Sequence, residues 1–158
     1  MSGFVTPTTP NVTDYLTFIR SGLGIGPIYL PDDSFWITTT FNMAIGTVNL
    51  ALTNATVGTT GPYYTLAVYN FAADRLLNFA LDQPGQSYFK DTRAALGLNS
   101  FAAGLVAASG DQGTSQTLEV IEAAKRMTIT DLAMMKTPYG RAYLDFAQAY
   151  GSTIWGLT

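Results

Sequence analysis

The sequence predicts a mainly α-helical fold: a small helical bundle with a projecting Gly/Ser-rich loop or hairpin and extended terminal arms. Apolar residues recur with helical spacing along 31–53, 62–82 and 137–150, and capping residues, prolines or glycines bound these stretches. The chain has 158 residues, which fits one domain with a substantial core. We therefore expect a single helical domain over 1–158.

Residues 1–10 contain two prolines among threonines, which predicts an extended N-terminal arm. A short helix is expected over 11–21, with Asn11 as its cap, Gly22 as its end, and three inward-facing side chains, Tyr15, Leu16 and Ile19. The glycine-rich segment 22–26 lacks the G-x-G-x-x-G spacing, and no predicted strand precedes it. It is therefore predicted to be a flexible turn.

A second helix is predicted to open at Pro31–Ser34 and to reach about Thr53. Asp32 and Asp33 lie at its start, where carboxylates favour the helix dipole, so they are interpreted as capping residues. One face carries an apolar stripe, Ile37, Phe41, Ile45, Val48 and Leu52. The opposite face is polar but uncharged, with Thr38, Asn42, Gly46, Asn49 and Thr53. A solvent-facing helix usually carries Lys and Glu, so this face is expected to contact protein.

A third helix is predicted from Pro62 to about Asp82, forming an antiparallel hairpin with the second. Its expected inner side consists of Leu66, Tyr69, Ala73, Leu76, Leu77 and Ala80. Asp74 and Arg75 are the interior charges of this helix. We interpret them as a pair at the surface or at a subunit boundary.

A short helix over 88–96 is followed by a segment, 96–117, that is built from small residues and lacks helical periodicity. We predict a projecting loop or loose hairpin there, with its tip at Ser109, Gly110, Asp111, Gln112 and Gly113. Its composition fits a flexible excursion and an interaction loop equally well. A short helix over 118–127 and a turn capped by Thr128 and Asp131 follow.

The last predicted helix begins at Thr137, whose hydroxyl can cap it, and at Pro138, which suits the first helical position. Four rings share one face and then Gly151 ends the helix. This aromatic face can pack into the chain's own core, but tyrosine hydroxyls also suit a subunit boundary. The candidate subunit-interface residues are therefore Tyr139, Tyr143, Phe146, Tyr150, Asn42 and Asn49.

Composition excludes several kinds of function. Charged residues make up 12% of the chain, about half of the roughly 25% that is usual. So little charge favours an obligate assembly, in which subunits cover each other's apolar surface. The net charge of −3 argues against a protein that grips nucleic acid through its phosphates.

The absence of Cys and His removes disulfides, the usual zinc sites and His-based catalytic triads. We therefore expect no enzyme activity, cofactor or metal. No charge occurs between Ser34 and Ala73, but Thr, Asn and Gly interrupt any apolar run of membrane-spanning length. The N-terminus has no signal-peptide pattern, so neither export nor membrane insertion is expected.

Three motifs form a pattern that covers most of the chain: YTLAVYNFAADRLLNFA (64–80), AASGDQGTSQT (107–117) and KTPYGRAYLDFAQAY (136–150). The pattern resembles the head-to-tail connector (adaptor) proteins of tailed bacteriophages. The resemblance implies a ring, commonly of twelve copies, that docks under the portal protein and continues the channel for the genome. The chain departs from the family in a longer spacer before TPYG and in its uncharged second helix.

The same resemblance implies binding partners and a location in the virion. The C-terminal tail, 151–158, would dock on the portal through Ile154, Trp155, Gly156, Leu157 and Thr158, and the 96–117 loop would reach a neighbour or the tail. Other copies of the chain, the portal and a tail nozzle or tail tube protein would be partners, while DNA would pass without specific binding. The protein would be made in the host cytoplasm and lie in the virion neck.

Three alternatives stay open. A capsid decoration protein or another minor virion structural protein shares the low charge, although many of these are β-rich. A carboxylate-based hydrolase would use Asp32, Asp33 or Asp74. A small membrane-active lysis protein would partition with detergent.

Overall fold

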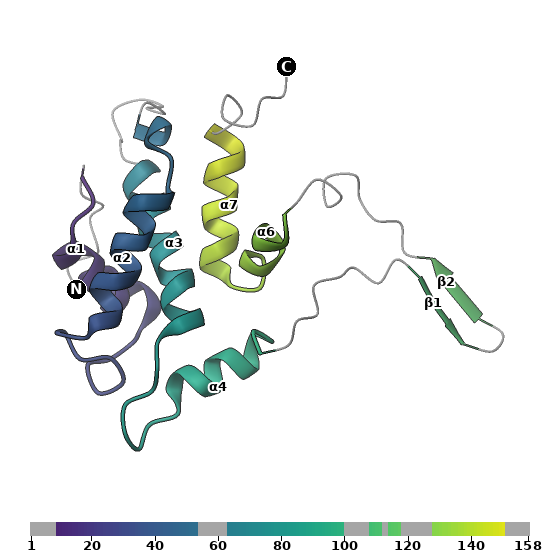
Figure 1. Ribbon diagram of the computed structural model, residues 1–158, viewed down its shortest axis with the longest axis horizontal. Coiled ribbons are helices and arrows are strands. Elements are labelled where there is room, and N and C mark those ends of the chain that lie inside the picture. Colours follow the sequence, from purple (N-terminus) through teal and green to yellow (C-terminus); the bar gives the residue numbers. More distant parts are fainter. Residues whose placement is uncertain (1–8, 54–62, 100–107, 112–113, 118–127, 151–158) are drawn as a thin grey trace.

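The protein is described by a computed structural model in which residues 9–53, 63–99, 108–111, 114–117 and 128–150 are placed. It is mainly helical and forms a small bundle, as predicted. The α-helices are α1 (Val12–Phe18), α2 (Phe35–Thr47), α3 (Tyr63–Phe79), α4 (Tyr88–Ala95), α6 (Ile129–Met134) and α7 (Pro138–Tyr150). Figure 1 shows α3 between α2 and α7 and antiparallel to both.

The central helix α3 is buried on almost every side, because α2 packs against one side of it and α7 against another. Five of the six residues predicted to face inward are buried, and Leu66 is half-buried. The prediction of a single buried side nevertheless underestimates how much of α3 is buried. Burial extends to a further set that includes polar residues: Tyr64, Thr65, Ala67, Val68, Asn70, Phe71, Ala72 and Asp74.

The first helix starts as predicted, since the Asn11 side chain accepts a hydrogen bond from the amide of Asp14 at 2.8 Å. Its end is different. The helix continues as a π-helical turn, Ile19–Leu23, and Gly24 closes it with φ of 71°, a conformation that favours glycine. Gly22 is therefore not the terminating residue.

The segment predicted to be a flexible turn is held in place by Arg20. The guanidinium donates to the carbonyl oxygens of Ile25 and Leu30, each at 2.6 Å, and pairs with Asp32. Ile25 and Leu30 are fully buried. These hydrogen bonds and this burial argue against the predicted flexibility, because a side chain next to the segment holds its backbone.

The second helix begins at Phe35, directly after the predicted opening residues, and is shorter than predicted. The interpretation of Asp32 and Asp33 as its capping residues is wrong, because Ser34 is the cap and Asp32 pairs with Arg20. The Ser34 hydroxyl accepts from the amide of Trp36 at 3.4 Å, while α2 ends at Thr47 rather than near Thr53. Val48 has extended backbone (φ −69°, ψ 127°), and a separate 3-10 turn, Leu50–Thr53, follows.

Four residues of the predicted apolar stripe of α2 are buried, but Ile45 is 38% exposed. Thr40 and Ala44 occupy the inward positions between Ile37 and Val48, so the buried face is rotated away from Ile45. The Thr40 hydroxyl donates to the Trp36 carbonyl at 2.8 Å. Thr40 can therefore lie on the buried face of α2, because a backbone carbonyl of the same helix accepts a hydrogen bond from its hydroxyl.

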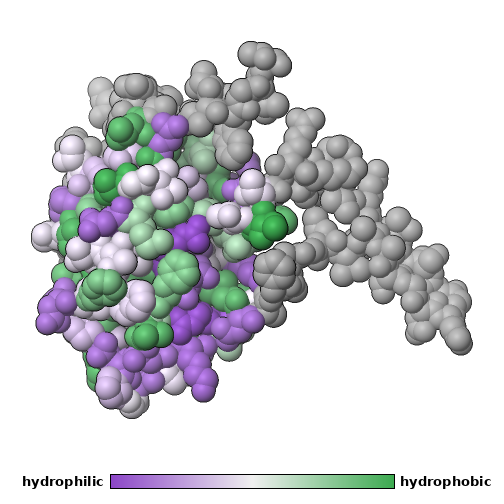
Figure 2. Space-filling model, in the orientation of Figure 1, coloured by the Kyte–Doolittle hydropathy of each residue, from purple (hydrophilic) through white to green (hydrophobic). Residues whose placement is uncertain are grey.

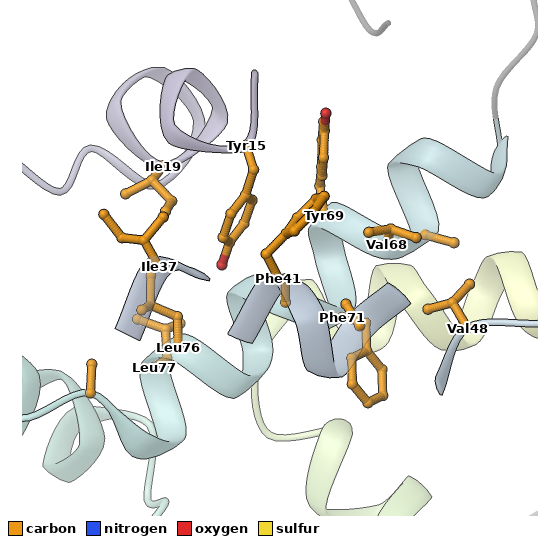
Figure 3. Close-up of a cluster of buried hydrophobic side chains, with 14 of the residues drawn as sticks. Tyr15, Ile19, Ile37, Phe41, Val48, Val68, Tyr69, Phe71, Leu76 and Leu77 are labelled. Carbon is orange, nitrogen blue, oxygen red and sulfur yellow. The ribbon is translucent and has the colours of Figure 1, made fainter. Parts of the chain in front are cut away.

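The core surrounds α3, and one part of it lies between α1, α2 and α3. Figure 3 shows the rings of Tyr15, Phe41 and Tyr69 converging there. The Tyr15 ring centroid lies 5.8 Å from that of Phe41 and 5.7 Å from that of Tyr69. The Tyr15 hydroxyl lies 3.2 Å from the Thr40 hydroxyl, so this buried phenol has a polar partner.

Two charged side chains fix the chain around α4. The Asp82 carboxylate accepts from the amides of Phe89 (2.6 Å) and Lys90 (2.9 Å) at the start of the helix. Arg93 donates to the carbonyls of Leu77 (3.2 Å) and Ala80 (2.7 Å), at the end of α3. The predicted helix over 88–96 is confirmed, with its last residue at Ala95.

The described part of 96–117 contains a short hairpin, as one form of the prediction proposed. Strand β1 (Ala108–Asp111) pairs antiparallel with β2 (Thr114–Thr117), with Ala108 opposite Thr117. Figure 1 shows the hairpin lying away from the helices. Gln112, Gly113, the arm over 1–8, the predicted helix over 118–127 and the tail over 151–158 lie outside the described residues.

We predict that Ile37→Ala lowers the free energy of unfolding by about 2–5 kcal/mol, since it leaves a cavity in the core. The matched change Ile45→Ala on the same helix should cost less than about 1 kcal/mol, because this side chain is partly in solvent. Urea denaturation followed by circular dichroism measures both. Equal losses would mean that the buried face of α2 has been misplaced.

Candidate functional site

Helices α6 and α7 each begin at a local cap. Thr128 and Asp131 form the predicted capping box at the start of α6, with the Thr128 hydroxyl accepting from the Asp131 amide at 3.2 Å. At the start of α7 the Thr137 hydroxyl accepts from the amide of Gly140 at 2.8 Å, and Pro138 is the first helical residue. Both predicted helix starts are confirmed.

This turn is tied to α3 through Asp74. The Thr137 hydroxyl donates to Asp74 Oδ1 at 2.5 Å, across 63 residues of sequence. Asp74 is 1% exposed and Thr137 is fully buried. The interpretation of Asp74 as a surface or boundary residue is therefore wrong. Its neighbours in the sequence, Ala73 and Leu76, are predicted core residues, and that was the available signal.

Arg75 also lies inside the fold more than expected. Its guanidinium carbon is 4.7 Å from the centroid of the Phe71 ring, a cation–π arrangement, and its Nε is 3.9 Å from Asp74 Oδ2. Burial raises the pKa of the Asp74 carboxyl, while the bond from Thr137 and the charge of Arg75 lower it by less. The buried polar cluster of Asp74, Thr137 and Gly140 therefore joins α3 to the α6–α7 turn.

Glycine is required at position 140, the last residue of the TPYG motif. A Cβ at this position would overlap the carbonyl oxygen of Met134 and come within 2.9 Å of Asp74 Oδ1. No side chain larger than hydrogen fits where α7 passes α6 and α3 this closely. The motif thus has a structural role in closing the turn.

The aromatic face of α7 packs against the chain's own core. Tyr139 meets Phe18 with ring centroids 6.3 Å apart, and its hydroxyl donates to the carbonyl of Gly22 at 3.3 Å. Tyr143 meets Phe71 at 5.1 Å and Phe146 meets Tyr63 at 5.9 Å. The core interpretation of this stripe is confirmed for the three described side chains, Tyr139, Tyr143 and Phe146. Each is only half-buried, so an edge of this face stays accessible.

The outer face of α2 is the other candidate surface. Phe35 is 71% exposed and Leu50, just beyond the helix, is 66% exposed. We define the outer α2 face as Phe35, Thr38, Asn42, Met43, Ile45, Gly46, Asn49 and Leu50, all of them exposed. Figure 2 shows this side of the molecule, with green apolar residues among pale and purple ones. The chain carries no charge between Ser34 and Ala73, so the face is uncharged throughout.

The structure does not bring the predicted interface residues together. Asn42 and Asn49 lie on or just after α2, whereas Tyr139, Tyr143 and Phe146 lie on α7, with α3 between the two helices (Figure 1). Sequence reasoning missed the exposed apolar residues of the outer α2 face, since Ile45 was assigned to the core. Ser109, Gly110 and Asp111 lie in β1, and the predicted portal-docking residues lie outside the described part of the chain.

The described residues offer little catalytic chemistry. Asp32 pairs with Arg20, Asp33 is exposed, and Asp74 is buried against Thr137. No group of three acidic side chains in the described ranges is arranged to hold a metal ion. None of the helices in those ranges combines the length and apolar character needed to cross a membrane. Comparison of the chain with family models, curated proteins and solved structures finds no match.

We predict that Gly140→Ala lowers the free energy of unfolding by about 2 kcal/mol or more, because the added methyl group overlaps the backbone of α6. Gly46→Ala is the matched control: its Cβ would have nothing within 4 Å, so it should stabilise α2 by about 0.5–1 kcal/mol. Thermal and urea unfolding measure both variants. A neutral effect at Gly140 would contradict the close approach of the two helices.

Proposed function

We propose that this chain is a structural subunit of a tailed-phage virion, forming a ring in the neck that joins the portal to the tail and continues the DNA channel. The proposal rests on the resemblance of three motifs to the connector family, and the uncharged outer α2 face is the structural observation that favours it. Both point to a protein whose role is assembly.

An isolated subunit would expose the outer α2 face to water at some cost. A solvated helix face normally carries charged side chains, which this one lacks, and Phe35 and Leu50 add apolar area. Thr and Asn side chains can exchange hydrogen bonds with water for bonds to a partner without desolvating a full charge. The face therefore has the composition of a protein–protein contact.

A ring of more than two copies requires each subunit to present two different surfaces, because its contacts are heterologous. The bundle offers such a pair, since α2 and α7 flank α3 (Figure 1). The outer α2 face supplies one surface, and the accessible edges of Tyr139, Tyr143 and Phe146 belong to the other. We propose that the predicted interface residues act on these two sides of the subunit.

The net charge suits a conduit. Tight DNA binding requires a dense set of Lys and Arg against the phosphates, and the chain holds 8 basic and 11 acidic residues. A ring of such subunits would let DNA pass with little adhesion. The portal, a tail nozzle or tube protein and other copies of the chain are the proposed partners.

The double change Thr38→Lys with Asn42→Lys tests the ring. It places charges on the outer α2 face, so assembly should be lost while helicity and unfolding free energy stay within about 1 kcal/mol of the wild type. Analytical ultracentrifugation and electron micrographs of the purified protein, alone and with the portal, measure assembly. Ala94→Lys, an exposed site on α4, is the matched control and should assemble normally. Rings that survive the double change would contradict the use of this face.

Trp155→Ala tests attachment to the portal. By the resemblance, this side chain belongs to the docking tail, and loss of an aromatic anchor typically costs about 2 kcal/mol or more per subunit. We expect unchanged circular dichroism and weaker co-sedimentation with portal rings. Tail docking is excluded if mutant and wild type bind equally across a dilution series that resolves avidity.

A further inference from the structure

The carboxyl group of Asp74 is enclosed but only half satisfied. Oδ1 accepts the hydroxyl of Thr137 at 2.5 Å. Oδ2 is buried and accepts no hydrogen bond from the described residues. Its nearest cation is Arg75, whose Nε lies 3.9 Å away, beyond hydrogen-bonding distance. Asp74 Oδ2 is therefore shielded from solvent and lacks a hydrogen-bond donor among the described residues.

An ionised carboxylate in such a place is costly, because its charge is removed from water without full compensation. The neutral form avoids most of that cost and keeps Oδ1 as an acceptor for Thr137. Burial accordingly raises the pKa of Asp74, although the bond from Thr137 and the charge of Arg75 act in the opposite direction. Burial therefore shifts Asp74 toward the protonated form relative to an exposed carboxyl group.

The other charged side chains near Asp74 in the described ranges make their hydrogen bonds elsewhere and do not compensate an ionised Asp74. On the α6–α7 segment, Lys136 donates to the Gly97 carbonyl at 3.0 Å and Arg141 donates to the Met135 carbonyl at 2.8 Å. Asp131 belongs to the capping box of α6. Burial, and after it the charge of Asp131, raises the pKa of Tyr143 on α7, while the charge of Arg75 lowers it. Helix α2, on the other side of α3, has no ionisable residue.

We propose that Asp74 is a proton-controlled latch, in which the neutral carboxyl holds the Thr137–Gly140 turn against α3 and ionisation loosens that turn. Thr137 transmits the change, since its hydroxyl donates to Asp74 and accepts from the Gly140 amide at 2.8 Å. Water drawn to an ionised Asp74 must enter between α3 and the turn, which separates Thr137 from its partner. The latch acts on the start of α7 and does not depend on the proposed ring.

The direction of the pH dependence follows from the linkage between protonation of Asp74 and closure of the turn. A carboxyl whose pKa is higher in the closed turn than in the open one stabilises the closed turn fully below the open-state pKa, near 3.9. That stabilisation is lost as the pH rises through the closed-state pKa. Each unit by which burial raises the pKa therefore changes the closed-to-open ratio by about tenfold.

The experiment uses the full chain and two nuclear magnetic resonance readouts from pH 3 to 8: the carboxyl carbon shift of Asp74 and the hydrogen-exchange protection of the Gly140 amide, corrected for its intrinsic rate. We expect Asp74 to titrate above its ordinary range. Gly140 protection should fall by about tenfold in total for each unit of that shift, beginning near the open-state pKa and levelling off above the pH at which Asp74 titrates in the closed turn. Asp74→Asn, which keeps an acceptor for Thr137, should give protection independent of pH. The control Asp33→Asn, at an exposed carboxyl, should leave the wild-type profile unchanged.

Two results would overturn the latch: an Asp74 that titrates at or below its ordinary value, or Gly140 protection that ignores the ionisation of Asp74 in the wild type. Both are measured without a variant, so the test holds if Asp74→Asn fails to fold. Thr137→Val adds an independent check on the carboxyl signal. Removing the bond that favours the charged form should move the Asp74 midpoint upward, and a downward shift would count against the geometry.

Discussion

Helix α3 is enclosed between α2 and α7, and this enclosure determines how its polar side chains are satisfied and how the C-terminal helix is placed. A helix buried on nearly every side must find a partner for each polar group it carries, because water cannot reach them. Asn70 meets this demand within the helix by donating to the Leu66 carbonyl at 2.8 Å. Asp74 cannot, and it takes its partner, Thr137, from the turn that begins α7. The requirement of one buried side chain thus helps to position the C-terminal helix.

Several charged side chains in the described ranges join one segment of the fold to another. Arg20 holds the loop before α2, Arg93 and Asp82 join α3 to α4, and Lys136 and Arg141 bind backbone carbonyls around the α6–α7 turn. Charge-assisted hydrogen bonds to backbone groups are stronger than neutral ones, so this use is effective in a small bundle. Exposed charges such as Asp33, Lys90 and Asp145 lie elsewhere on the described surface, whereas the outer α2 face has none. The absence of charge from that face is the feature that favours a protein partner there.

Sequence reasoning succeeded where a helix cap marks its own position and failed where backbone geometry or burial departs from regular periodicity. The helix starts at Asn11, Thr128 and Thr137 were all predicted, since a cap and its amide are a few residues apart. The end of α2 was not, because extended backbone at Val48 replaces the regular periodicity that a sequence pattern assumes. The glycine segment 22–26 was called flexible from composition, yet Arg20 and the fully buried Ile25 and Leu30 fix it. The aromatic stripe of α7 was predicted, but its contacts with Phe18, Tyr63 and Phe71 could not be predicted from spacing.

The helical class, the order of the helices and the lack of Cys and His can be read from the residues directly, since periodicity, capping residues and composition are properties of the chain alone. The burial of Asp74, the outward position of Ile45 and the need for glycine at 140 depend on how the helices pack. Burial depends on which helix covers a position, and the contact that encloses Asp74 joins residues 63 apart. No local pattern encodes a contact of that separation.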